Sequence, residues 1–415
     1  MQILKKSSPL HSILAFLSIL LIILHPYTIY GKPGILIASF FAIYALHKGV
    51  KKSFFLHLIM PTLLLLFIAT IGGISSVIND IPQITHPVAV ISLLVMIFAA
   101  NGIFLYLKKI NISTDEFLLI ILLVVVLNSV IILLELQFDS LRSFIEGYLD
   151  PFTGGSINYA QGYRLRGIAS AGGAGLSISI PAALIIALHL YDRRKLNSIF
   201  LIIIFLILFS SVLVIGRTGL VLLIIPISMY FFMLLFRRKN GFAFLRSLSF
   251  IVIPMLIIVP FFYQYISNFL SLMFGDGFVK YAFGFLLEGR SGIEEEGTVR
   301  LVTEYIQVLP MEFPQVLTGY GFYGGTEFYP WTDSGFARMF LSVGFLLGII
   351  FYLVLYYMYF LSFRLNKFLI GSFILVLTIA EIKEPLLYSG FASRMFILIF
   401  VYYYCEDKYL KAKSR

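Results

Sequence analysis

Long apolar segments separated by short polar stretches recur along the whole sequence. Apolar runs of about 18 residues or more are the signature of helices that cross a membrane. Because lipid offers the backbone no hydrogen-bonding partner, a segment of this kind spans by forming a helix. The pattern predicts about twelve spanning helices, over residues 11–30, 34–49, 54–76, 87–107, 117–137, 167–191, 196–215, 218–236, 248–268, 335–360, 368–382 and 387–404.

Basic residues mark alternate connections between the predicted spans. Lysine and arginine concentrate in the cytoplasmic loops of membrane proteins. Here most of the 31 basic residues fall at the termini and in every second connection. We therefore expect both termini to be cytoplasmic. The two long connections, 138–166 and 269–334, then lie outside, and the second is long enough to carry short helices of its own.

The composition supports a membrane protein and limits the kinds of partner that we expect. Hydrophobic residues make up 60% of the 415-residue chain and charged residues 13%, against about 45–50% and ~25% in soluble domains. The net charge of +10 is explained by basic cytoplasmic loops, so nucleic acid is not an expected partner. We predict an all-α polytopic membrane protein in which residues 1–415 form one bundle, with Cys405 as a buried structural thiol.

The expected outer face holds more arginine than its topology requires, because topology alone leaves that face poor in positive charge. The planar guanidinium group matches two phosphate oxygens at once, which makes arginine the favoured residue for phosphate recognition. The candidates for binding a lipid diphosphate are Arg164, Arg166, Arg217, Arg290, Arg300 and Arg338. Lipid headgroups are the alternative ligands of Arg164 and Arg166, and a local ion pair with Glu304 is the alternative for Arg300.

Arg217 interrupts a long apolar stretch. It lies in Ile215-Gly216-Arg217-Thr218-Gly219, the only break between residues 199 and 236, so almost no loop separates the two spans. A charge at the centre of a membrane helix costs ~2.5–3.5 kcal/mol on insertion scales, and such residues are functional by default. We interpret Arg217 as an anion-binding residue; the alternative is a side chain that extends to the lipid headgroups.

A segment rich in glycine and aromatic residues follows in the main outer connection. Residues 319–325 are Gly-Tyr-Gly-Phe-Tyr-Gly-Gly, which matches G-x-G-x-x-G without the βαβ context that a dinucleotide site needs. Tyr320, Tyr323 and Trp331 offer flat apolar rings on which sugars can stack. Anchoring of these rings in the membrane interface is the alternative.

Acidic residues near these arginines are candidates for acid–base chemistry. Asp333 lies at the start of a predicted span beside Arg338, and a carboxylate in such a place is a candidate general base. Glu304 is the second candidate for this role. Capping of a helix N-terminus is the alternative role of Asp333.

The last two spans carry further charges at their junction. We interpret them as a structural charge cluster formed by Glu381, Lys383, Glu384 and Arg394. The six histidines are scattered along the chain and show no metal-ligand spacing. We expect neither a metal nor another cofactor.

Several of these motifs together resemble the O-antigen polymerase and ligase superfamily. The likeness covers most of the chain as architecture, with about a dozen spans and the main outer loop before the tenth. The spacing of Arg164 and Gly175 also resembles the arginine–ten residues–glycine pattern of some polymerases. The other matching motifs are Arg300-x-x-x-Glu304, Leu317-Thr318-Gly319-Tyr320-Gly321, Asp333-Ser334 opening a span with Gly344 and Gly348, and the Gly-Arg-Thr-Gly turn at 216–219.

This resemblance implies a membrane glycosyltransferase of the GT-C type that uses glycans linked to undecaprenyl diphosphate. Arginines at the positions of Arg217 and Arg300 would hold the donor diphosphate. Ligases of the superfamily place a histidine where this chain has Asp333. The departure favours the polymerase (Wzy) branch.

We therefore expect a metal-independent polymerase of O-antigen or a related surface polysaccharide. Its active site would face the periplasm from the cell inner membrane. Its expected partners are undecaprenyl-diphosphate-linked glycans and membrane lipids, with a chain-length regulator as a further candidate. Two other functions stay open: ligation of the glycan to the lipid A core, and transport of lipid-linked oligosaccharide by a flippase. A flippase should carry charges along helices that face a central cavity.

Overall fold

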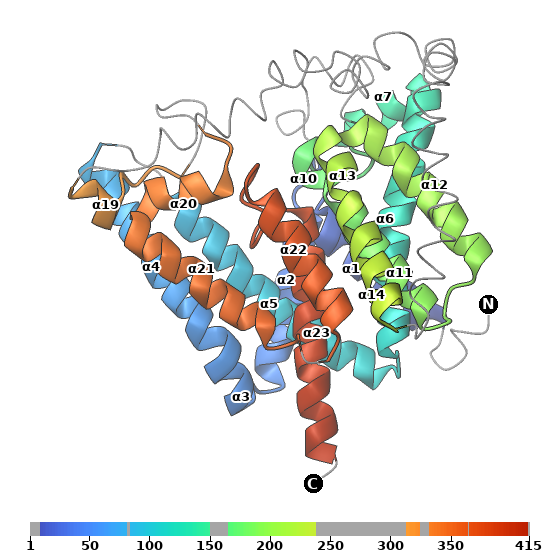
Figure 1. Cartoon of the computed structure of the whole chain (residues 1–415), viewed down its shortest axis with the longest axis horizontal. Helices are drawn as coiled ribbons and strands as arrows, with labels where there is room; N and C mark the ends of the chain where they lie inside the picture. The colour runs from blue at the N-terminus through green and yellow to red at the C-terminus, as the bar shows by residue number, and fades with distance from the viewer. Residues whose placement is uncertain are drawn as a thin grey trace.

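A computed structural model describes residues 9–80, 84–149, 165–237, 313–323, 332–363 and 365–413 of the chain. Regular structure within these ranges is helical, apart from two isolated β-bridges that join Thr28 to Gly31 and to Leu149. The helices and their connections are drawn in Figure 1. In chain order they are α1 (Pro9–Leu24), α2 (Pro33–His47), α3 (Lys52–Phe54), the π-helix η1 (Phe55–Ile59), α4 (Met60–Ile78), α5 (Thr85–Lys109), α6 (Thr114–Gln137), α7 (Asp139–Tyr148), α10 (Ala174–Ser177), α11 (Ser179–Asp192), α12 (Ser198–Ile215), α13 (Arg217–Leu222), α14 (Ile224–Arg237), α19 (Gln315–Thr318), α20 (Gly335–Val343), α21 (Phe345–Phe360), α22 (Lys367–Ala380) and α23 (Phe391–Lys413).

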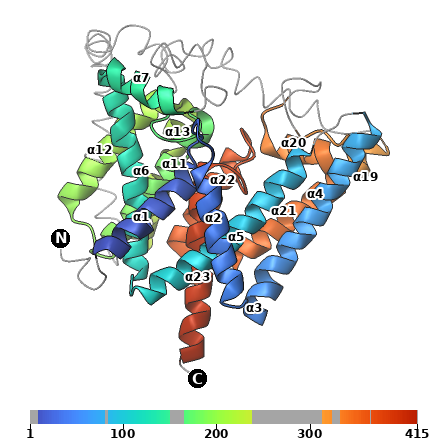
Figure 2. The same cartoon turned by 180° about the vertical axis from the view of Figure 1, so that it is seen from behind.

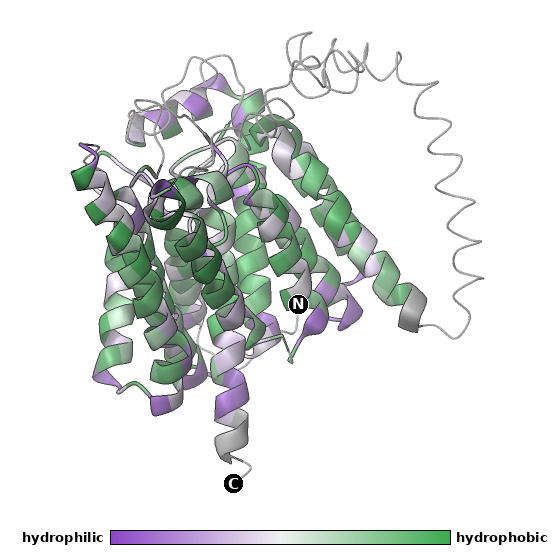
Figure 3. Cartoon of the chain, turned by 60° about the vertical axis from the view of Figure 1, so that its left-hand side comes forward, coloured by the Kyte–Doolittle hydropathy of each residue, from purple (hydrophilic) through white to green (hydrophobic). Residues whose placement is uncertain are grey.

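The described helices include five that are long and apolar enough to cross a membrane. They are Lys52–Ile78, Thr85–Lys109, Thr114–Gln137, Ala174–Asp192 and Ser198–Ile215. Shorter apolar helices add Pro9–Leu24, Pro33–His47, Thr218–Leu234, Phe345–Phe360 and Lys367–Ala380. Apolar residues cover the middle of the helices and polar residues gather toward their ends (Figure 3). The prediction of a helical membrane protein is thereby confirmed, while about twelve spans and a GT-C arrangement stay predictions.

Every predicted span within the described residues contains a helix, but several of these spans are divided into more than one element. The span predicted at 335–360 divides into α20 and α21 at Gly344. Gly344 has a φ of 82°, and a Cβ added there would meet the carbonyl carbon of Leu317 at 2.6 Å. The break therefore brings two backbones into direct contact. The span predicted at 248–268 lies outside the described residues.

The span predicted at 167–191 begins later than expected, at Ala174. Gly167 and Gly173 have φ values of 59° and 79°, which favour glycine and end helical continuity. A Cβ on Gly167 would lie 2.4 Å from Oδ1 of Asn128, so the segment before α10 packs closely against α6. The four-residue spacing of Gly167, Ala171 and Gly175 predicts small residues on one face of a single helix, and this prediction is wrong because Gly167 and Ala171 lie before α10.

The core of the bundle forms around α5 and α23. Helix α5 packs against α2, α4 and α23, and α23 also contacts α1, α6, α11 and α22. Side chains from Met395 to Cys405 along α23 are buried, which explains why this helix is apolar on all sides until its last turns. Cys405 is a buried free thiol, as predicted.

The bundle has two ends that differ in their connections (Figure 2). At one end, here the α20 end, Ser170 N donates to Leu24 O and Gly335 N donates to Glu381 O. This end gathers the connections 25–32, 165–173 and 381–390 together with residues 332–334. At the other, the C-terminal end, Lys108 pairs with Glu406 and Lys195 pairs with Asp115. Among the described residues, the basic connections after α5 and after α11 thus lie at the same end of the molecule as the last turns of α23.

Candidate functional site

The α20 end places Asp333 between two cations. Its Oδ1 lies 3.4 Å from Nη2 of Arg338, and its Oδ2 lies 4.0 Å from Nζ of Lys383. Arg338 is held in place because its Nε donates to the carbonyl of Thr332 at 2.9 Å. The Asp333 side chain is 31% exposed, so a ligand can reach the carboxylate.

Asp333 does not cap α20, and the alternative role given to it from the sequence is wrong. The N-cap is the next residue, Ser334, whose Oγ accepts from Ala337 N at 3.4 Å. A helix has one N-cap position, and serine fills it as well as aspartate does. The Asp333 carboxylate is therefore left for its contacts with Arg338 and Lys383.

A buried carboxyl group, that of Glu381, fixes the geometry of this site. Its Oε1 accepts from the Tyr352 hydroxyl at 2.8 Å, and its Oε2 accepts from the backbone N–H groups of Leu386 and Leu387 at 2.6 and 2.7 Å. A Cβ on Gly335 would meet Oε1 of Glu381 at 2.4 Å. Only a glycine therefore lets α20 approach the 381–390 connection, which carries Lys383, this closely.

Glu381 lies in the connection after α22, and its surroundings change the pKa of its carboxyl group. Burial raises the pKa of this carboxyl to about 7, while its hydrogen bonds from Leu387, Tyr352 and Leu386 act in the opposite direction. The predicted charge cluster is thus divided in the structure. Glu381 accepts hydrogen bonds from Tyr352 and from the backbone, whereas Lys383 lies beside Asp333.

Arg394 forms few polar contacts among the described residues. It lies in the first turn of α23 with its Cζ 5.7 Å from the ring centroid of Phe391. Its Nη1 is shielded from solvent and has no hydrogen-bond partner. No ion pair found among the described residues includes Arg394.

A second cation, Lys32, shares the surroundings of Arg394. Burial, followed by the positive charges of Arg394 and Lys32, lowers the pKa of His25 to about 3. The Lys32 Nζ lies 4.1 Å from the ring centroid of Tyr27. Because His25 stays neutral at physiological pH, this corner of the α20 end carries two positive charges around a neutral imidazole.

Arg166, a predicted phosphate ligand, has a different environment. Its side chain is fully buried, and its Nε and Nη2 donate to Oε1 of Glu146 at 2.9 and 2.7 Å. Its Nη1 donates to the carbonyl of Ser170 at 3.1 Å. This geometry favours a structural ion pair that holds the segment before α10 against α7.

Arg217 opens α13 immediately after Gly216. The start of this helix packs on α10, because the Gly219 N–H donates to Ser177 Oγ at 3.0 Å and a Cβ on Gly219 would meet Ser177 O at 2.3 Å. On α10, which this turn contacts, a Cβ on Gly175 would lie 3.2 Å from Oε2 of Glu384. The glycine–arginine–threonine–glycine turn therefore lies near the 381–390 connection.

The predicted sugar-stacking tyrosines differ from each other. Tyr323 is buried, with its ring stacked on His86 at 4.4 Å and its hydroxyl in contact with that of Tyr388. A sugar cannot reach this ring, so the stacking role predicted for Tyr323 is wrong. Tyr320 is partly exposed, and its backbone is fixed by a bond from its N to Leu341 O at 2.7 Å.

The remaining predicted site residues lie outside the described residues. They are Arg164, Arg290, Arg300, Glu304 and Trp331. In the part of the chain that the structure describes, no group of three or more metal-ligand side chains is present. Comparison with known proteins gives no match with a family model, a curated protein or a solved structure.

Proposed function

We propose that this protein is a membrane glycosyltransferase that polymerises oligosaccharide repeat units linked to undecaprenyl diphosphate. The observation that supports it is the Arg394 guanidinium, which has no ion pair with a described carboxylate and lies at the same end of the bundle as Asp333, Arg338 and Lys383. A diphosphate is an anion that such a cation can hold. The motifs that resemble the O-antigen polymerases supply the reaction class.

In the proposed reaction, a hydroxyl group of one lipid-linked unit attacks the anomeric carbon of the glycan on another. Asp333 accepts the proton of that hydroxyl while the new glycosidic C–O bond forms. The bond from the anomeric carbon to the diphosphate oxygen breaks, and undecaprenyl diphosphate leaves with the electron pair. Arg338 and Arg394 stabilise the charge that develops on the leaving group.

The ligase and the flippase compete with this proposal. A ligase would use the same donor and transfer it to the lipid A core. A flippase requires charges along helices that face a central cavity, whereas Asp333, Arg338 and Lys383 gather at one end of the bundle. This placement favours chemistry at the membrane surface, on the side that the positive-inside rule predicts to be periplasmic.

The experiment replaces Asp333 by Asn in a strain whose own copy is deleted, and resolves the surface polysaccharide on a gel. We expect the ladder of chain lengths to collapse to a single-repeat band, because the base is lost while the side chain keeps its size. Arg142→Ala is the matched control, since Arg142 pairs with the exposed Asp139 on α7 at the same end of the molecule.

The deletion strain itself separates the three functions. A polymerase defect leaves single repeats on the surface, whereas a ligase or flippase defect removes them. A normal ladder from Asp333→Asn, in protein that inserts at wild-type level, would contradict the proposed role of this residue. A deletion without any single-repeat band would contradict polymerisation.

A further inference from the structure

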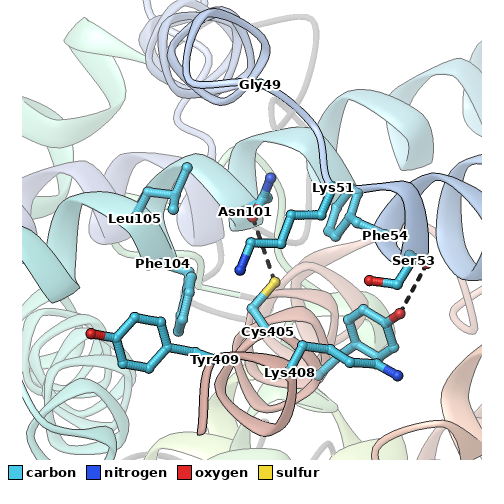
Figure 4. Close-up of a pocket in the computed structure, with 11 residues that line it drawn as sticks. Gly49, Lys51, Ser53, Phe54, Asn101, Phe104, Leu105, Cys405, Lys408 and Tyr409 are labelled. Carbon is cyan, nitrogen blue, oxygen red and sulfur yellow. Dashed lines mark hydrogen bonds between the residues drawn. The ribbon is translucent and has the colours of Figure 1, made fainter. Parts of the chain in front are cut away.

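A small cavity opens at the C-terminal end of the bundle, and Figure 4 shows the residues that line it. Its volume is about 80 Å³, well above the ~10–15 Å³ that a cavity needs to hold one water molecule. Helices α3, α5 and α23 and the connection between α2 and α3 form its walls. The residues that matter for its chemistry are Lys51, Asn101, Phe104, Lys408 and Tyr409.

The cavity is cationic. The side chains of Lys51 and Lys408 both line it, and no carboxylate does. The neighbouring acid Glu406 is taken by Lys108, with an Nζ–Oε2 distance of 2.6 Å. Asp407 lines a neighbouring hollow beside His57, and Lys408 lines both spaces. Two lysines and no carboxylate therefore contribute to the wall of this cavity.

The rest of the wall includes a polar pair, in which the Cys405 thiol donates to the Asn101 carbonyl oxygen at 3.5 Å (Figure 4). The cations that phosphate oxygens favour are supplied by Lys51 and Lys408. The wall beside them is apolar, formed by Phe54, Phe104 and Leu105.

We infer that this cavity binds the phosphate headgroup of an anionic phospholipid. A phosphodiester carries the negative charge that Lys51 and Lys408 attract, and the glycerol and first acyl carbons match the apolar wall. Basic pockets between membrane helices on the cytoplasmic side are known to receive anionic headgroups. The cavity lies at the end where the basic connections meet, which the positive-inside rule predicts to be cytoplasmic. This inference does not depend on the proposed glycosyl transfer.

The test measures retention of lipid by the purified full-length protein with native mass spectrometry. The probes are phosphatidylglycerol, phosphatidylcholine and inorganic phosphate, each added to protein in the same detergent. We expect phosphatidylglycerol to be retained in preference to phosphatidylcholine. Because each basic residue near a lipid surface contributes ≈ 1 kcal/mol, removal of one lysine should weaken retention about fivefold.

The variants are Lys51→Gln, Lys408→Gln and their combination, with Lys52→Gln as the control. Lys52 follows Lys51 directly in the chain but does not line the cavity, so the control removes the same charge at almost the same place. We expect the double variant to lose retention by more than tenfold and Lys52→Gln to bind like the wild type. Size-exclusion profiles of all variants check that the protein remains folded.

Each contrary outcome overturns a stated part of the inference. Equal loss in Lys52→Gln would show a diffuse charge effect and no site. Equal binding of inorganic phosphate and phosphatidylglycerol would show a phosphate site without a role for the lipid. Retention of phosphatidylglycerol that is unchanged in the double variant would place the lipid elsewhere.

Discussion

Arg166 and Arg394 lie near the same connection of the bundle and differ in almost every contact. Ser170, which accepts from Arg166, donates its own N–H to Leu24, and the charge of Arg394 acts on the next residue, His25. Arg166 is neutralised by Glu146. Arg394 keeps an Nη1 without a hydrogen-bond partner.

The difference shows how a charge inside a membrane protein can be assigned to structure or to function. Removal of one member of a buried ion pair leaves an uncompensated charge and is strongly destabilising. An unpaired cation already carries that cost in the folded protein, and such residues are functional by default. We therefore assign Arg166 to the fold and Arg394 to the binding of an anion.

The largest effect should come from breaking the paired arginine. Glu146→Ala removes the carboxylate that accepts from Nε and Nη2 of the fully buried Arg166, and we expect a loss of about 3 kcal/mol in the free energy of unfolding. The measurement is thermal unfolding of the protein in detergent. The double variant Glu146→Leu with Arg166→Leu is the control, since it removes both charges and should recover most of the loss. Wild-type stability in Glu146→Ala would place Arg166 in the same class as Arg394.

Glu381 sharpens the comparison because it is a buried acid that a proton can neutralise. Its pKa in the folded protein is raised to about 7. The folded state therefore binds this proton more tightly than the unfolded state does, and stability decreases as pH rises from about 4.5 to 7. The shift corresponds to about 3 kcal/mol over this range. In Glu381→Gln this part of the pH dependence of the unfolding temperature should disappear.

The control for Glu381 is the wild-type chain measured over the same pH range and salt concentration. Glu381→Gln also gives one hydrogen-bond acceptor in place of two, so its stability should be lower at low pH. A pH profile parallel to that of the wild type would show that Glu381 does not titrate in this range.

The unpaired arginine should affect activity more than stability. Arg394→Gln removes a cation that we place on the leaving diphosphate, and the loss of one such donor lowers turnover on the order of 10²-fold. The free energy of unfolding should stay within about 1 kcal/mol of the wild type, because no partner is left unpaired. Arg394→Lys, which keeps the charge, should restore part of the activity. An unfolding defect as large as that of Glu146→Ala would contradict this assignment.

The smallest effect should come from an arginine whose ion-pair partner among the described residues is an exposed acid. Arg142 on α7 pairs with Asp139, whose side chain is 84% exposed. Exposed pairs contribute about 0.2–1 kcal/mol. Arg142→Ala should therefore leave both polysaccharide length and unfolding temperature almost unchanged. A large effect would mean that α7 contributes to the site through its surface.

Several of these distinctions could not be made from the sequence. The apolar runs predicted where the helices lie, and the basic connections predicted which helix ends come together. The burial of Arg166 could not be predicted, because Arg166 lies outside the helices and its partner Glu146 is twenty residues away, in α7. Asp333 and Ser334 are both good N-caps, and only the structure separates them.

The local backbone was equally hard to predict at the glycines. Gly344 breaks a continuous apolar run because another backbone, that of Leu317, lies against it. The orientation of the Tyr323 side chain, which stacks on the buried His86, could not be predicted either. Tertiary contacts of this kind leave no periodic signal in the chain. The apolar segments therefore predicted the positions of the helices but not the points at which the helices are interrupted.

Helix α23 joins the two regions for which we propose ligands. Arg394 lies in its first turn and Lys408 near its last turns, roughly 21 Å apart along the axis at 1.5 Å per residue. The part between them is enclosed by the other helices. α23 is thus a helix enclosed along its middle that carries, near its two ends, the groups that we propose to bind phosphate. Any twist of this helix about its axis would turn both groups together, which would couple the two proposed ligand sites mechanically.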